Sequence, residues 1–227
     1  MRHNRGTMIV ESRDSDTLKP TDVELIVALL EDADLLISVE GVEQQLEDFP
    51  LIVTVEVEGQ LDGFLFASLE RVGGTPSILW GLGSIRPAED SHDVLNALTT
   101  ELYRRAAISF PDEDVLVGGR FSHPAAYAEI FRHHDVAPRP GYKATGEERA
   151  WGRRLAKRFR CDRRYDERSF MVTAVEEPEP RLHTPGTAHS SSDDVLTFLG
   201  ELSGDQLFVA CGWVLAEELE EVLNKTG

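Results

Sequence analysis

The stretch from Leu51 to Ile85 constrains the fold more than any other part of the chain, because it encodes three consecutive strands. Residues 51–57 are rich in β-branched side chains, and after a glycine-containing turn residues 64–69 return as a second strand. Such a pattern is typical of a β-hairpin. Residues 77–85 form a third predicted strand, and an amphipathic helix over residues 91–109 follows it. These elements predict an α/β fold with a mixed, twisted sheet flanked by helices.

The remaining pattern extends this domain in both directions. Further strands are predicted at residues 8–12, 114–119, 169–175 and 206–211, and further helices at residues 22–30, 35–47, 124–131 and 215–224. Residues 1–7 are predicted to be a disordered start, and residues 8–175 the main domain. Residues 176–194 are rich in Pro, Glu, Thr and Ser, which predicts a loop or linker. Residues 195–227 are expected to complete the same domain with a strand and a helix.

The negative net charge of the chain makes some classes of binding partner unlikely. The 227 residues carry a formal net charge of −18, and only four of the 23 basic residues are lysine. A strongly negative field repels polyanions, so nucleic acid is an unlikely partner for the whole chain. An acidic, lysine-poor surface indicates either adaptation to high salt or a genome rich in G and C, and the sequence leaves both open.

The setting predicted from the sequence is cytoplasmic. No apolar run approaches the roughly 20 residues that cross a bilayer, and the N-terminus lacks the apolar stretch of a secretory signal. The two cysteines, Cys161 and Cys211, are too few for a disulfide framework or a metal quartet. No membrane association is expected.

Several short motifs, in this order, resemble the GNAT acyl-CoA N-acyltransferase superfamily. Leu46–Val55 followed by Glu58–Phe64 is similar to the second and third strands of that family, including its glycine turn. Trp80–Pro87 is similar to its central strand and to the proline before the cofactor loop, and Val115–Phe131 to its next strand and helix. The resemblance covers about residues 8–175.

The resemblance implies a fold, a reaction and a cofactor. It implies transfer of an acyl group from acetyl-CoA or another acyl-CoA to the amine of a small molecule or peptide. It places the thioester on the third strand, where a bulge separates two strands, and so assigns cofactor binding to Gly83, Ser84, Ile85 and Arg86. An N–H group freed there would polarise the thioester carbonyl. The alternative is a GNAT-fold module without catalysis that serves binding or assembly.

The segment after Pro87 departs from the family pattern. Relatives have a glycine-rich loop there, whereas this chain has Ala88 followed by Glu89, Asp90 and Asp93 before and within the helix start. A helix N-terminus attracts anions, and carboxylates placed there occupy that role themselves. We therefore expect these acids to disfavour the diphosphate of CoA.

Two side chains are candidates for acid–base chemistry. Tyr127 is the candidate general acid for a thiolate leaving group, and the alternative is a core aromatic on an amphipathic helix. Glu56, with Glu58 beside it, is the candidate base for the amine, and the alternative is a solvated strand residue. Histidines near His133 lack a third ligand at a convincing spacing, so no metal is predicted.

A basic stretch from Arg149 to Arg168 contrasts with the acidic chain. It holds nine of the 23 basic residues, and Trp151, Leu155 and Phe159 give it one apolar edge, which predicts a helix. It is either a solvated surface or a dock for phosphate groups or for the acidic half of another copy. A homo-oligomer formed through this helix is the partner it favours.

Overall fold

The computed structural model describes residues 7–88, 91–173, 175, 178–184 and 206–226. The strands are β1 (Met8–Asp14), β2 (Leu51–Val57), β3 (Gln60–Val72), β4 (Thr75–Ile85), β5 (Val115–Phe121), β6 (His134–Ala137), β7 (Met171–Val172), β8 (Leu182–His183) and β9 (Leu207–Val214). The α-helices are α1 (Pro20–Asp32), α2 (Val39–Asp48), α3 (Ser91–Ser109), α4 (Pro124–Phe131), α5 (Gly146–Arg158) and α7 (Ala216–Thr226). Short 3₁₀ turns lie at Ser15–Thr17 and Asp162–Arg164.

One mixed sheet organises the described chain, in the order β1-β2-β3-β4-β8-β5-β9-β6, with β7 pairing to β9. The strands β1 to β4 are antiparallel neighbours, whereas β4 and β5 run parallel. The predicted α/β class, with a mixed sheet flanked by helices, is therefore confirmed.

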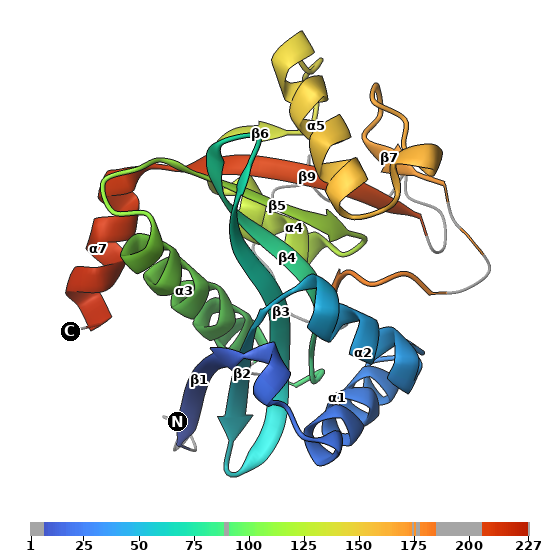
Figure 1. Ribbon diagram of the computed structural model, residues 1–227, viewed down its shortest axis with the longest axis vertical. Helices are drawn as coiled ribbons and strands as arrows, with labels where there is room; N and C mark the ends of the chain where they lie inside the picture. The colour runs from blue at the N-terminus through green and yellow to red at the C-terminus, as the bar shows by residue number, and fades with distance from the viewer. Residues whose placement is uncertain (1–6, 89–90, 174, 176–177, 185–205, 227) are drawn as a thin grey trace.

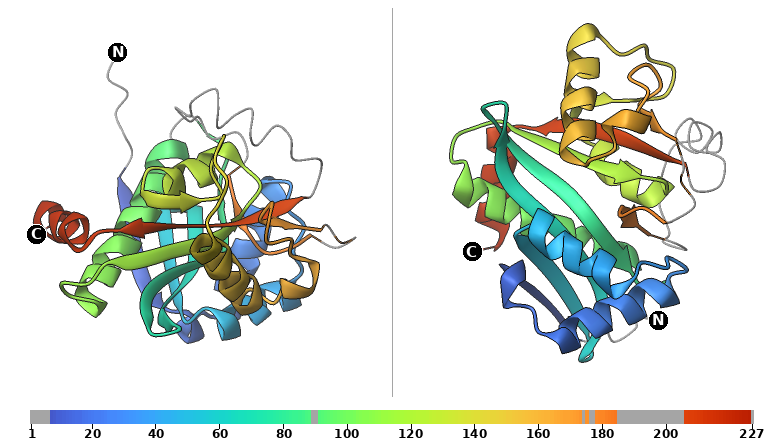
Figure 2. Two further views of the ribbon diagram at one scale, coloured as in Figure 1. Left: turned by 90° about the horizontal axis from the view of Figure 1, so that it is seen from above. Right: turned by 45° about the vertical axis from the view of Figure 1, so that its right-hand side comes forward.

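Helices cover both faces of the sheet and create two apolar cores. Helices α3, α4 and α7 pack with one face, and their core includes Trp80, Leu98 and Phe208. Helices α1, α2 and α5 pack with the other face, around Phe66 and Leu155. Figures 1 and 2 show α1 and α2 on one side of the sheet and α3 on the other.

Local signals set several helix boundaries. The side chain of Ser38 accepts a hydrogen bond from the Gly41 N–H at 3.2 Å, so α2 begins at Val39 rather than at the predicted Leu35. Helix α5 begins with a capping box between Thr145 and Glu148. These caps satisfy N–H groups that the first helical turn leaves free.

Two predicted elements differ in the structure. The basic stretch is a helix only up to Arg158, because Arg160 adopts a positive φ of 59° that an α-helix does not accommodate. Residues 176–194 were predicted to be a loop or linker, but Leu182–His183 within them is strand β8 of the sheet. The first difference is a local C-terminal cap, in which the Cys161 N–H donates to the Ala156 carbonyl, whereas the second arises from pairing of β8 with β4 and β5.

Candidate functional site

The centre of the sheet contains a divergence between two parallel strands. Strands β4 and β5 pair directly at their starts, where Ser77–Leu79 lies against Leu116–Gly118. Beyond that point another strand, β8, lies between them. Diverging strands present backbone N–H and C=O groups along two facing edges, and those groups require partners.

A bulge in β4 lies where the divergence begins. Leu65 of β3 faces Gly83, but Ala67 faces Trp80, so one β3 residue opposes two residues of β4. The extra residue frees the Leu82 N–H, which donates a buried hydrogen bond of 3.2 Å to Oε1 of Gln45 on α2. The bulge turns β4 away from its parallel neighbour, as bulges do.

Strand β8 fills the opening. The Gly83 N–H donates a hydrogen bond of 3.0 Å to the Arg181 carbonyl. Leu182 pairs with Gly83 on one side and with Phe121 on the other, and His183 pairs with Ser84. All four residues from Arg181 to Thr184 are buried. The chain therefore supplies its own partner for the facing edges of the cleft.

Two histidines hold β8 at one end. His183 Nε2 lies 2.8 Å from the carbonyl oxygen of Ala33, just after α1, and its ring lies edge-to-face with that of His123 at 4.5 Å. Burial, together with the nearby His183 and Arg181, lowers the pKa of His123 to about 4. Burial also lowers the pKa of His183. Both rings are consequently neutral at pH 7.

A bulged central strand that diverges from its parallel neighbour is the arrangement that the resemblance predicted, in the predicted order of elements. The fold is GNAT-like. No protein-family model matches the sequence, and no curated protein matches it. The evidence for the fold is therefore the topology.

Three solved structures are partly similar to this chain. The ribosomal-protein-S18-alanine N-acetyltransferase of Escherichia coli is 10% identical over 91% of this chain and 95% of its own, with a TM-score of 0.46. Ard1 of Thermoplasma volcanium is 11% identical over 91% and 98%, with a TM-score of 0.45. A GNAT family acetyltransferase of Brucella melitensis, solved with acetyl-CoA, is 19% identical over 48% and 75%, with a TM-score of 0.35.

The residues that were predicted to bind the cofactor are bonded or buried within the sheet. The Gly83 N–H, expected to face a thioester, is bonded to Arg181. Ser84 is fully buried, and within the described chain its hydroxyl has no hydrogen-bond partner. Ile85 is fully buried in the core beneath α3. The sequence therefore located the strand and the bulge, and missed the segment that covers them.

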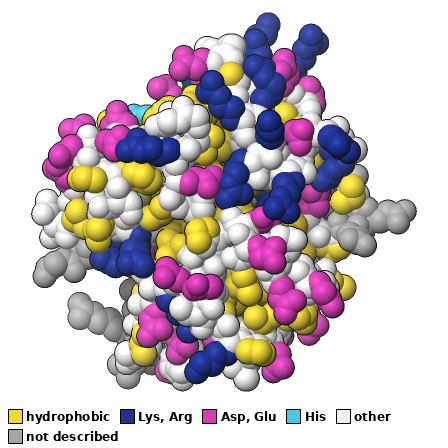
Figure 3. Space-filling view, in the orientation of Figure 1, with side chains coloured by type: hydrophobic (Ala, Val, Ile, Leu, Met, Phe, Trp, Pro, Cys, Tyr) yellow, Lys and Arg dark blue, Asp and Glu magenta, His cyan; other side chains and the backbone are white. Residues whose placement is uncertain are grey.

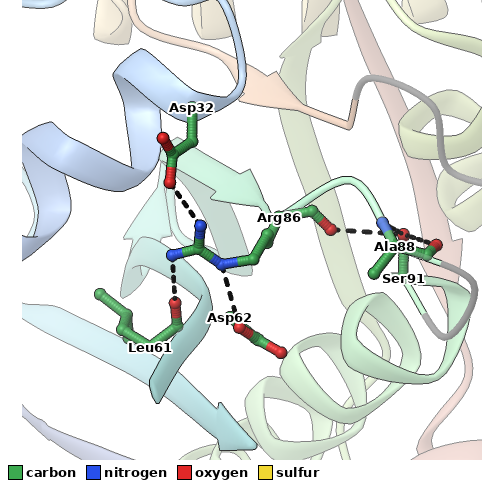
Figure 4. Close-up of polar contacts among 6 residues, drawn as sticks. All are labelled: Asp32, Leu61, Asp62, Arg86, Ala88 and Ser91. Carbon is green, nitrogen blue, oxygen red and sulfur yellow. Dashed lines mark hydrogen bonds and ion pairs between the residues drawn. The ribbon is translucent and has the colours of Figure 1, made fainter.

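Arg86 connects three segments instead of facing the cleft (Figure 4). Its Nε lies 3.1 Å from Oδ1 of Asp62, its second amino group lies 3.2 Å from the Leu61 carbonyl oxygen, and it also forms an ion pair with Asp32. Two carboxylates balance its single charge. Little of that charge is left for a phosphate group.

The start of α3 is closed by its own side chains. Ser91 Oγ accepts a hydrogen bond of 2.8 Å from the Ala88 N–H and donates one to the Ala88 carbonyl. Asp93 lies in the first turn, where a carboxylate favours the helix dipole. Glu89 and Asp90, which were expected to act with it, lie outside the described residues.

The two candidate acid–base residues are not brought together. Tyr127 on α4 is fully buried, and its hydroxyl donates a hydrogen bond of 2.5 Å to the Pro138 carbonyl. Burial raises its pKa, so the phenol holds its proton more firmly than usual. Glu56 is exposed on β2, two strands away from β4 in the sheet. Their catalytic roles remain predictions.

The basic residues form a surface patch above the sheet. Figure 3 shows Lys and Arg side chains gathered over α5, while Asp and Glu are more frequent below it. Among the described residues, four of the nine have carboxylate partners, namely Arg153 with Glu167, Arg158 with Glu70, Arg160 with Asp48 and Arg164 with Glu179. Part of the positive charge of the patch is therefore paired within the chain and is not available to a ligand.

Residues 181–184 are the part of the site that sequence reasoning missed. They lie among prolines and acids, and only Thr184 is β-branched, so no strand pattern marks them. No described group of three His, Cys, Asp or Glu residues is arranged to hold a metal. Among the described helices none is both long and apolar enough to cross a membrane.

Proposed function

We propose that this chain is a GNAT-type N-acyltransferase that moves an acyl group from acetyl-CoA or another acyl-CoA to an amine of a small molecule or peptide. The observation that carries this proposal is the divergence of β4 from β5 beside the β4 bulge. Such an opening presents free backbone groups to an amide-bearing chain, and the pantetheine arm of CoA has two amides.

With β8 seated, the cleft does not fit an acyl-CoA. The Gly83 N–H is used by Arg181, and the fully buried Leu182 occupies the space between the strands. Arg86 is neutralised by Asp32 and Asp62, and the first turn of α3 carries Asp93. The proposed activity therefore requires β8 to leave the cleft, and the chain's residues define no reaction step while it stays.

Within this proposal Glu56 is the candidate base, because it is exposed at the end of the β2–β3 hairpin on the side of the sheet where β4 ends. Tyr127 is the candidate acid only if its hydroxyl exchanges the Pro138 carbonyl for a substrate atom. We place the protein in the cytoplasm, since Cys161 and Cys211 are both free and buried.

A second candidate is a GNAT-fold module without catalysis, used for binding or assembly. The insertion of β8 favours it, because a strand that completes the sheet also removes the cofactor edge. Self-association through the basic patch would suit such a role. Basic side chains of that patch that have no carboxylate partner among the described residues would face acidic residues of a second copy.

Acetyl-CoA turnover separates the two candidates. The intact protein is incubated with acetyl-CoA and a panel of amines that includes polyamines, an aminoglycoside and peptides with free N-termini, and the released CoA thiol is measured. Amine-dependent thiol release above a protein-free control supports the acyltransferase. No release, together with no rise in melting temperature at millimolar acetyl-CoA, would support the module, because a ligand of the native state stabilises it.

A further inference from the structure

We propose that β8 is a built-in competitor for the acyl-CoA cleft, so that the affinity of the protein for acyl-CoA is set by how often β8 leaves. This inference rests on the proposed acyltransferase function. It concerns residues Arg181–Thr184, which lie in the opening of the sheet.

The first step is that β8 uses the same backbone groups that a pantetheine arm would need. The Gly83 N–H points into the opening and donates to the Arg181 carbonyl at 3.0 Å. Peptide segments add to open sheet edges through such main-chain bonds. One N–H cannot serve two acceptors at full strength, so β8 and a bound amide exclude each other at Gly83.

The second step is that β8 also uses the same space. Leu182 is fully buried between Gly83 and Phe121. A Cβ atom placed on Gly83 would lie only 3.0 Å from Cδ1 of Leu182. The cleft is therefore filled to contact distance, and a second chain has no room beside Leu182.

The third step is that some interactions stabilise β8 in the opening and others destabilise it there. Burial of Leu182 and the contact of His183 with the Ala33 carbonyl favour its position. Against this, Ser84 Oγ, His183 Nδ1 and Thr184 Oγ1 are buried and have no hydrogen-bond partner within the described chain. Each buried unpaired polar atom lowers the net stability of the docked strand.

The fourth step is that the topology allows β8 to leave without breaking the rest of the sheet. Strands β6 and β9 are neighbours in the sheet, and residues 138–206 connect them in the sequence. Strand β8 belongs to this connection. The direct pairing of β4 with β5 through Ile78 and Val117 does not involve β8. Release of β8 therefore opens the cleft while the flanking ladders persist.

A pair of matched leucine variants tests the proposal. Leu182→Ala weakens β8, whereas Leu219→Ala removes another buried leucine, from helix α7, which lies outside the cleft. Binding of acetyl-CoA is measured by calorimetry, with 3′,5′-ADP, which lacks the pantetheine arm, as the control ligand. Because apparent affinity scales with the open fraction, Leu182→Ala should bind acetyl-CoA at least about tenfold more tightly than wild type. Neither Leu219→Ala nor 3′,5′-ADP should show this gain.

A milder variant and a second readout cover failure of Leu182→Ala to fold. His183→Ala removes the Ala33 contact and should give a smaller gain in the same direction. Hydrogen exchange of the peptide containing β8 reports its release directly. Equal, tight acetyl-CoA binding by wild type and both variants would overturn the competition and leave the acyltransferase standing. Faster exchange of β8 in a variant that still does not bind acetyl-CoA would overturn the competition and the acyltransferase together.

Discussion

At Gly83 the approach of three strands depends on the absence of a side chain. A Cβ there would lie 2.7 Å from Cδ1 of Leu65, 2.9 Å from the Phe64 carbonyl oxygen and 3.0 Å from Cδ1 of Leu182. We expect Gly83→Ala to lower the free energy of unfolding by about 1–3 kcal/mol, because overpacking displaces neighbours. Urea denaturation measures this.

The matched control is Gly146→Ala, in the first turn of α5, where the nearest atom to a new Cβ is 4.0 Å away. It should leave the free energy of unfolding unchanged or raise it by up to about 1 kcal/mol. Equal stability of the Gly83→Ala variant and wild type would show that β3, β4 and β8 do not meet at this residue.

Removal of the Tyr127 hydroxyl distinguishes a structural role of this residue from a catalytic one. Its hydroxyl donates to the Pro138 carbonyl from a fully buried position. Tyr127→Phe should therefore cost about 1–2 kcal/mol of unfolding free energy, since a buried carbonyl loses its donor. Any acyl transfer should stay within a few-fold of wild type, whereas loss of a general acid costs about 10²–10⁴-fold.

Urea denaturation of the Tyr127→Phe variant gives its free energy of unfolding, and a thiol-release assay of the same preparation gives its rate of acyl transfer. Tyr142→Phe is the control, because Tyr142 is 41% exposed and should change neither quantity. Turnover reduced a hundredfold with unchanged stability would restore Tyr127 as the acid.

At the scale of elements, β8 should loosen in acid. Burial lowers the pKa values of His183 and His123, and Arg181 lowers both further, while the Ala33 carbonyl and Asp34 only partly offset this for His183. A pKa of about 4 for His123 in the folded protein, against about 6.5 unfolded, means that the unfolded chain binds more protons between those values. The stabilisation is full above pH 6.5 and is lost as the pH falls toward 4.

The expected loss from this histidine is about 1–2 kcal/mol between pH 7 and pH 4.5. Carboxylates contribute to acid unfolding as well, so the measurement is the difference between wild type and His123→Gln. The variant should lose less stability over that interval, as measured by urea denaturation at each pH. Parallel losses in the two proteins would show that the pair does not sense protons.

The sequence predicted the elements whose signals are local. The β2–β3 hairpin, β4 and α3 were located because alternation, glycine turns and helical periodicity appear within their own residues. Strand β8 could not be located in this way. Thr184 is the only β-branched residue of segment 181–184. Strand β8 is extended because it pairs with β4 on one side and with β5 on the other.

The position of the candidate site in the sheet could be predicted from the sequence, but the bonding partners of its residues could not. The resemblance placed a bulge in the third strand, and β4 contains one. The partners of Arg86, Asp32 and Asp62, come from different elements, and no spacing in the sequence connects them. Burial and pairing of this kind follow from the assembled sheet, so the chemistry of the cleft required the structure.

At the scale of the whole molecule, charge repulsion should make stability depend on salt. A net charge of −18 opposes the compact state, and added salt screens it. We expect the melting temperature to rise from 0.05 to 0.5 M NaCl and then to level off, because the Debye length falls from about 14 Å to about 4 Å over that range.

A scan to 3 M NaCl distinguishes the two origins of the acidic composition. A plateau above 0.5 M supports composition alone, whereas a continued rise up to 3 M would indicate adaptation to high salt. Light scattering on the same samples reports the self-association predicted for the basic patch, which should weaken as salt increases.

The central claim is that the chain's own residues 181–184 occupy the opening between β4 and β5. The most direct test is an NMR measurement of scalar coupling across the hydrogen bond from the Gly83 amide nitrogen to the Arg181 carbonyl carbon. We predict a detectable coupling between these two nuclei and slow exchange of the Gly83 amide proton. A Gly83 amide that exchanges rapidly and shows no coupling to Arg181 would contradict the account.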